Sequence, residues 1–120
     1  LNANESLLFI TDSNNHRIRV VNRNNGIIST ICGNGNNANS GSGGLAINAQ
    51  ISNPNGLAFD KIRNYLYIAA YIIVRRIDMN SGTILDIAGN SEGFSGDNGP
   101  ANASSFRDLY AISLDILGNI

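Results

Sequence analysis

The chain has 120 residues and a net charge of −1 at neutral pH; 14% of its residues are charged and 42% are hydrophobic. This length suits one packed domain, and this composition excludes a disordered chain. The absence of a basic excess argues against a nucleic-acid partner, and no apolar run in the sequence reaches the roughly 18 residues that a membrane span requires.

The first part of the chain, residues 1–32, is expected to form three strands of a sheet. Asn25-Gly26 marks a hairpin, because glycine supplies the positive φ that a tight turn needs. A long link rich in Gly, Asn and Ser follows over residues 33–54. It ends in a compact piece with one apolar anchor, Ile51, and is interpreted as a tether between two sheets.

Residues 55–88 are expected to form a complete unit of four short strands, over residues 56–60, 65–70, 73–78 and 83–88. Each segment is rich in β-branched and aromatic residues and is bounded by Gly, Asn, Asp or Pro. Successive rather than alternating apolar residues in the second and third strands predict a sheet that is covered on both faces. No segment of the sequence shows the apolar period of an amphipathic helix.

A second link is expected over residues 89–108 and the first strand of a further unit over residues 109–120. The chain repeats itself at an offset of about 55 to 58 residues: Gly26-Ile27-Ile28 corresponds to Gly82-Thr83-Ile84, for example. One such unit cannot bury its own apolar surface and needs further units stacked beside it. We therefore predict an all-β fold of antiparallel four-stranded blades, a fragment of about two blades of a β-propeller.

The first hairpin resembles the signature of the NHL-repeat family, with Asp12 and Asn15-His16-Arg17-Ile18 as the motif residues. The segments NPNGLAFD and SGDNGPANASSF resemble the long variant of this repeat, which has a GDGGPA-type link. The resemblance covers essentially the whole chain and implies a propeller, commonly of six blades.

The second repeat departs from the signature, because Ala70 replaces Asp12 and two loop residues are missing. In the first repeat we expect Asp12 to pair with Arg17 across the hairpin. In the second repeat we expect apolar packing, with Tyr71 in the core of the blade.

Few residues of the sequence are suited to chemistry. His16 is the only histidine and Cys32 the only cysteine, so neither provides a metal site or a disulfide. Cys32 is expected to be a small buried side chain. Asp60 and Asp115, at equivalent strand ends, are expected to accept backbone N–H bonds in turns. We predict no catalytic residue, no cofactor and no bound metal.

One small basic group stands out in the second repeat. Arg75 and Arg76, with Lys61 and Arg63 nearby, are interpreted as a solvated strand edge paired with Asp78.

The sequence predicts a non-catalytic scaffold that binds a protein or a glycan through its loops, where binding residues usually lie. The candidate contact positions are Asn34, Asn36, Asn37, Glu92, Phe94, Asp97 and Tyr110. The alternative is a fragment of a propeller enzyme, similar to amidating lyases or lactonases, whose metal ligands lie on missing blades. Self-association through open blade edges is a further expectation, with three copies completing a ring of six blades.

Overall fold

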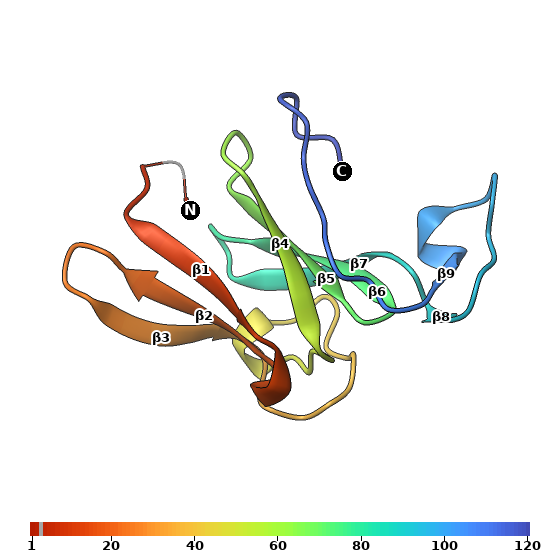
Figure 1. Ribbon diagram of the computed structural model, residues 1–120, viewed down its shortest axis with the longest axis horizontal. Coiled ribbons are helices and arrows are strands. Elements are labelled where there is room, and N and C mark those ends of the chain that lie inside the picture. The colour runs from red at the N-terminus through yellow and green to blue at the C-terminus, as the bar shows by residue number, and fades with distance from the viewer. Residues whose placement is uncertain (3) are drawn as a thin grey trace.

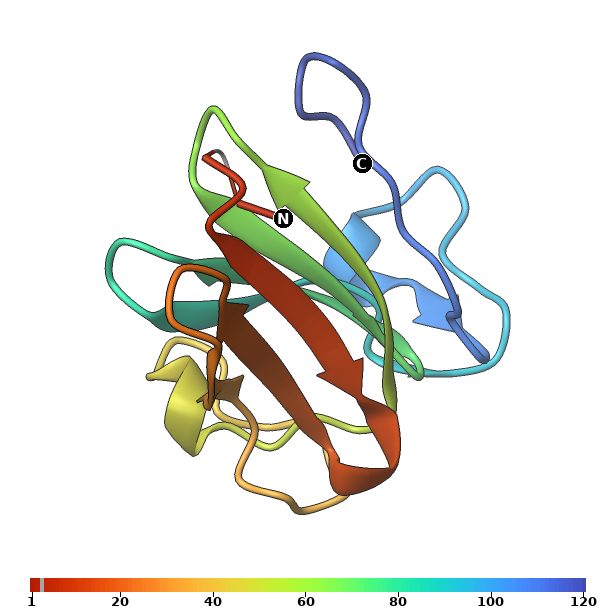
Figure 2. The ribbon, with the colours of Figure 1, turned by 60° about the vertical axis from the view of Figure 1, so that its left-hand side comes forward.

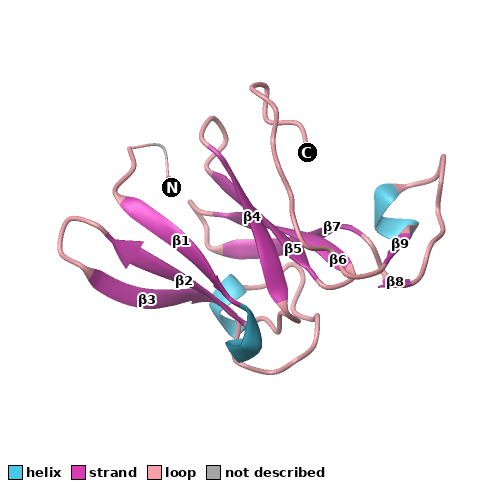
Figure 3. Cartoon of the chain, in the orientation of Figure 1, coloured by secondary structure: helices cyan, strands magenta, loops and turns pink. Residues whose placement is uncertain are grey.

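Among residues 1–2 and 4–120, which the computed structural model describes, the chain is all-β and has no α-helix (Figure 1, Figure 3). The first sheet holds β1 (Leu7–Asp12), β2 (Arg17–Asn22) and β3 (Ile27–Cys32). The second sheet holds β4 (Pro54–Asp60), β5 (Tyr65–Ala70), β6 (Ile73–Asp78) and β7 (Thr83–Ala88). Three single turns of 3-10 helix are η1 (Ser13–Asn15), η2 (Ala46–Asn48) and η3 (Ala101–Ala103).

Both sheets are antiparallel meanders in which each strand pairs with the next strand along the chain. Their outer hairpins turn at Gly26 and Gly82, which have φ values of 72° and 73°. Each glycine N–H donates to the carbonyl of the residue four positions earlier, at 2.7 Å. The four expected strands of the second repeat are confirmed, and the first of them begins two residues earlier than predicted, at Pro54.

The core lies between the two sheets, which pack face to face (Figure 1). The Phe9 and Phe59 rings stack across this interface with their centroids 5.5 Å apart. The most deeply buried apolar side chains, at most 2% exposed, include Ile18, Cys32, Ile51, Leu66, Ile68, Ile77 and Ile84. Five of the six residues of β5 are buried, as its continuous apolar pattern predicted.

Cys32 is buried at the end of β3, as the sequence predicted. Burial raises the pKa of its thiol to about 11. The thiol is therefore protonated at neutral pH, and the side chain acts as a small apolar group.

The first link (residues 33–53) and the second link (residues 89–108) share one backbone conformation. Gly33 N–H donates to Ala46 O at 3.1 Å, and the corresponding Gly89 N–H donates to Ala101 O at 2.9 Å. A Cβ at Gly33 would lie 2.2 Å from the carbonyl oxygen of His16, so only glycine fits this approach. Residues Ser91–Glu92 (β8) and Ser105–Phe106 (β9) of the second link form a short parallel pair.

Residues 109–120, expected to be a strand, form no β-ladder with any part of the chain that the structure describes. Leu109 makes one isolated bridge with Tyr71, and Asn55 Nδ2 donates to Leu109 O at 3.1 Å. The segment then runs close to β4, where Ala111 approaches Gly56 (Figure 1). A strand needs a second strand to share its N–H and C=O groups, and none of the described residues takes that place.

Candidate functional site

The residues that resemble the NHL signature lie in the β1–β2 hairpin and anchor the first link. His16 has a φ of 52°, and its Nδ1 accepts a hydrogen bond from Asn53 N–H at 3.3 Å. Arg17 donates to the carbonyls of Asn15 at 2.9 Å and of Asn34 at 3.2 Å. Ile18 is fully buried. These contacts are structural, because each one fixes the turn or the link.

The expected pairing of Asp12 with Arg17 is wrong. Asp12 Oδ1 accepts a hydrogen bond from Asn15 Nδ2 at 2.8 Å, and Asp12 Oδ2 lies 3.5 Å from the guanidinium of Arg19. Arg17 sits opposite Asp12 in the ladder, but its side chain reaches the link carbonyls instead.

The second hairpin has a different polar contact, so the expected core position of Tyr71 is also wrong. Tyr71 is only half-buried, and its hydroxyl donates to Glu92 Oε2 at 2.8 Å. Arg107 holds the other oxygen of Glu92 at 2.8 Å. The hydrogen bond with Glu92 raises the pKa of Tyr71, while the bonds from Tyr71 and then Arg107 lower the pKa of Glu92.

The interpretation of the basic group as a solvated strand edge is wrong for Arg75. Its side chain is fully buried, and its Nε donates to Asp86 Oδ1 at 2.7 Å. Its two terminal nitrogens donate to the carbonyls of Gln50 at 2.6 Å and Ser40 at 3.0 Å. Arg75 therefore fastens the first link to the second sheet. The hairpin register, which places Arg75 opposite Asp86, is the signal that sequence reasoning missed.

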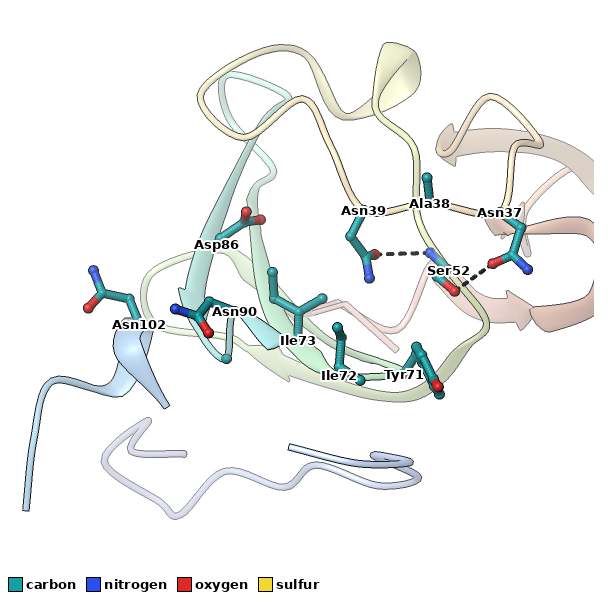
Figure 4. A pocket seen from close by; sticks show the side chains of 11 residues that line it. Asn37, Ala38, Asn39, Ser52, Tyr71, Ile72, Ile73, Asp86, Asn90 and Asn102 are labelled. Carbon is teal, nitrogen blue, oxygen red and sulfur yellow. Dashed lines mark hydrogen bonds between the residues drawn. The ribbon is translucent and has the colours of Figure 1, made fainter. Parts of the chain in front are cut away.

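A cleft of about 610 Å³ opens where the two links approach the β5–β6 turn (Figure 4). Its polar lining comes from the first link on one side and from β7 and the second link on the other. The lining side chains with polar groups are those of Asn37, Asn39, Ser52, Tyr71, Asp86, Asn90 and Asn102. Ile72 and the buried Ile73 supply the apolar part of the wall.

The side of the cleft formed by the first link is held in place by hydrogen bonds (Figure 4). Asn39 Oδ1 accepts from Ser52 N–H at 3.0 Å, and Asn37 Oδ1 accepts from Ser52 Oγ at 2.6 Å. These bonds use the amide oxygens and leave the amide N–H groups of both side chains for a ligand. The carboxylate of Asp86 is fixed by Arg75 through one oxygen only.

On the other side of the cleft, the amides of Asn90 and Asn102 make no hydrogen bond to another described residue. Together the two sides offer amide N–H donors, amide oxygens and one carboxylate oxygen to the same space. This set of groups can bind hydroxyl, amide or ammonium groups of a ligand.

The structure brings only part of the predicted contact set into this cleft. Asn37 lines it, together with Asn39, Asn90 and Asn102, which are not among the predicted contact positions although Asn39 and Asn90 lie in the loops 34–42 and 90–98 that the sequence favours for contact. The other predicted positions lie outside it: Asn34, Asn36, Glu92, Phe94, Asp97 and Tyr110. Phe94 and Tyr110 are highly exposed, at 86% and 72%.

Asp60 and Asp115 form the turns that the sequence predicted. Asp60 Oδ1 accepts from the N–H groups of Ile62 at 2.8 Å and Arg63 at 3.0 Å. Asp115 Oδ1 accepts from the N–H groups of Leu117 at 2.8 Å and Asn119 at 2.9 Å.

In the described part of the chain, no three His, Cys, Asp or Glu side chains gather in a group that could hold a metal ion. No helix there is long and apolar enough to cross a membrane.

Neither the protein-family models nor the curated proteins give a match to this chain. Among solved structures, the chain is similar to a structural genomics protein of unknown function from Bacteroides thetaiotaomicron, with a TM-score of 0.79 and 22% sequence identity. The similarity covers 92% of this chain and 28% of that chain. At this level of identity it establishes the fold alone.

Proposed function

We propose that the chain is a section of an NHL-type β-propeller and acts as a non-catalytic scaffold that binds a glycan or a protein through its loop face. Two observations support the propeller: two antiparallel meanders pack face to face, and the links that follow them share one conformation. The motif residues of the first hairpin fasten the link to the blade, which suits a structural signature.

The cleft between the two links is the observation that carries the binding function. Its volume falls within the range of small-ligand sites, roughly 300–1,000 Å³. Its polar groups are mainly side-chain amides, which both donate to and accept from hydroxyl groups. Because Ser52 fixes Asn37 and Asn39 in advance, binding costs little side-chain entropy. These features favour a glycan.

The test is binding of the labelled chain to an array of glycans, followed by calorimetry with the glycan that gives the strongest signal. The double variant Asn90→Ala, Asn102→Ala removes two amides from the cleft wall. We expect affinity to fall by about 5- to 150-fold, because each of the two lost hydrogen bonds contributes roughly 0.5–1.5 kcal/mol.

The matched control is the double variant Asn24→Ala, Asn48→Ala, at two exposed asparagines outside the cleft. It should bind as the parent chain does, and all the variants should melt at the same temperature. Equal loss of binding in both double variants would contradict a site in the cleft, and so would the absence of any bound glycan.

A protein partner is the second candidate, favoured by the exposed aromatic rings of Phe94 and Tyr110. Loss of binding in Tyr110→Ala, with the Asn90→Ala, Asn102→Ala chain unaffected, would move the site from the cleft to these rings.

A further inference from the structure

The charge of the cleft comes from one lining side chain. Among the described residues that line the cleft, Asp86 is the only carboxylate, and none is a lysine, an arginine or a histidine. Tyr71 also lines it, but its hydroxyl donates to Glu92 and this hydrogen bond raises its pKa, so Tyr71 is neutral at pH 7. The surroundings of Asp86 therefore decide which charge a ligand can bring into the cleft.

Arg75 balances the charge of Asp86 from behind the wall of the cleft. The guanidinium is fully buried, and its Nε donates to Asp86 Oδ1 at 2.7 Å. Its two terminal nitrogens donate to the carbonyls of Gln50 and Ser40. Each nitrogen of Arg75 thus already donates a hydrogen bond, and Arg75 does not line the cleft. An anionic ligand would meet the carboxylate without reaching the cation.

Asp86 presents its second oxygen to the cleft. Its side chain is 33% exposed, and its backbone N–H donates to Ser42 Oγ at 3.0 Å, which fixes the main chain as Arg75 fixes the side chain. The Oδ2 atom makes no hydrogen bond to a described residue. A carboxylate oxygen accepts hydrogen bonds and cannot donate them. This atom can therefore bind a hydroxyl group, and it repels a ligand carboxylate or sulfate.

The cleft has an apolar floor between two polar walls. Figure 4 shows Ile72 and Ile73 between Asn39 of the first link and Asn90 of the second link. The end of the first link and the start of the second link both reach the β5–β6 turn (Figure 2). A hexose ring is divided in the same way, since its faces carry C–H groups and its rim carries hydroxyl groups. The floor suits the ring face and the walls suit the hydroxyls.

The wall formed by the second link is also fixed before a ligand binds. Gly89 N–H donates to Ala101 O and Asn90 N–H donates to Ser104 O, both at 2.9 Å. These two bonds bring the Asn102 side chain to the same cleft as Asn90. Each of these amides can donate and accept, so a hydroxyl that donates to Asp86 can accept a hydrogen bond from an amide N–H.

We propose that the cleft selects an uncharged hexose unit and that Asp86 is the residue that sets this selectivity. Its Oδ2 accepts from one sugar hydroxyl, while the asparagine amides contact the hydroxyls beside it. A ligand carboxylate or sulfate is excluded by repulsion from Asp86. An ammonium group gains little, because Arg75 already balances the carboxylate and the ligand cation must lose its water. This inference rests on the proposed glycan function.

The test compares matched pairs of methyl glycosides that differ only at C6: glucoside and glucuronide, galactoside and galacturonide, mannoside and mannuronide. Affinities for the full chain are measured by NMR titration at pH 7, where the uronides are anionic. We expect at least one neutral glycoside to bind. It should bind at least about tenfold more tightly than its uronide, because the like charge of Asp86 opposes the uronide.

Asn102→Lys adds a cation to the wall without touching the buried ion pair. Asn102 is exposed and its side chain makes no hydrogen bond to a described residue, so the fold should not change. The affinity of the uronide relative to its neutral partner should rise about two- to fivefold, the range of an exposed ion pair. Asn48→Lys, at an exposed asparagine outside the cleft, is the matched control and should leave this ratio unchanged.

Asp86→Asn tests the selecting residue directly. The asparagine oxygen still accepts from Arg75 Nε, but the charge of the buried guanidinium is no longer balanced. The uronide should therefore gain at least about fivefold relative to its neutral partner. A melting curve shows whether this variant folds; if it does not, Asn102→Lys carries the same test.

The outcomes separate this selectivity from glycan binding itself. A uronide that binds the parent chain as tightly as its neutral partner would overturn the proposal, and so would an unchanged ratio in folded Asn102→Lys. Glycan binding in the cleft would still stand in both cases. If none of the three neutral glycosides bound, hexose recognition would be overturned, and the glycan array would then decide the proposed function separately.

Discussion

The two sheets of this chain share one register but differ in what covers them. In the second sheet, Leu66, Ile68 and Ile84 are fully buried. Their counterparts in the first sheet, Leu8, Ile10 and Ile28, are more than a third exposed. The strands are built alike, so the difference comes from the elements beside them. A repeated strand pattern becomes core only where a neighbouring sheet and link close over it.

Arg75 and Arg19, at corresponding positions of the two sheets, show that the burial of a charged side chain also depends on the elements beside it. Arg75 is buried because Asp86 and two link carbonyls meet its donors. Arg19 faces Thr30 in the corresponding place and has no link over it. Burial of a guanidinium is tolerated where its hydrogen bonds are provided, and around Arg75 the first link and β7 provide them.

The largest expected effect is a difference in stability between substitutions of Arg75 and of Arg19. Arg75→Met should lower the free energy of unfolding by about 3–5 kcal/mol, because it leaves two link carbonyls and Asp86 without a donor. Arg19→Met should cost less than about 1 kcal/mol. Urea denaturation measures both values. Equal losses would show that Arg75 does not fasten the link.

A smaller effect is expected from matched isoleucines. Ile84→Ala removes a fully buried side chain and should cost about 3 kcal/mol in urea denaturation, since it leaves a cavity. Ile28→Ala should change stability by about 0.5 kcal/mol or less, because half of its surface is already exposed. A large loss for Ile28→Ala would mean that the first sheet is covered from within the same chain.

The smallest effect concerns the two aspartate turns and depends on pH. Burial alone would raise the pKa of Asp60, but the hydrogen bonds from the Arg63 side chain and from the backbone N–H groups of Arg63 and Ile62 lower it overall. The lowered pKa means that this carboxylate stabilises the fold above its unfolded pKa of about 3.9. That contribution is lost as the pH falls through the lower pKa of the folded state.

Asp60→Asn should therefore cost about 1–2 kcal/mol at pH 7 and progressively less toward pH 2. Asp115 also has a lowered pKa, chiefly through the backbone N–H of Asn119, but its turn is exposed. Asp115→Asn should cost less than Asp60→Asn at pH 7. Melting temperatures measured from pH 2 to pH 7 test both expectations, and a constant difference between Asp60→Asn and the parent chain would contradict them.

The strands and the turns could be read from local sequence. Gly26 and Gly82 end hairpins because their backbone conformation disfavours other residues, and apolar runs such as 65–70 mark covered strands. The candidate site could be read only in part. Asn37 was predicted as a contact, but Asn90 and Asn102 join it only because the second link folds back beside the β5–β6 turn.

The sequence by itself determined the all-β class, the meander of short strands, the repeat and the aspartate turns. These features depend on backbone preferences and on periods of a few residues, which the local sequence carries. Only the tertiary structure decided that Arg75 is fully buried and Arg19 only partly, that Arg17 binds link carbonyls rather than Asp12, and that residues 109–120 form no strand. Each of these outcomes depends on which distant backbone groups come within hydrogen-bond reach, and that is settled by how the sheets and links pack together.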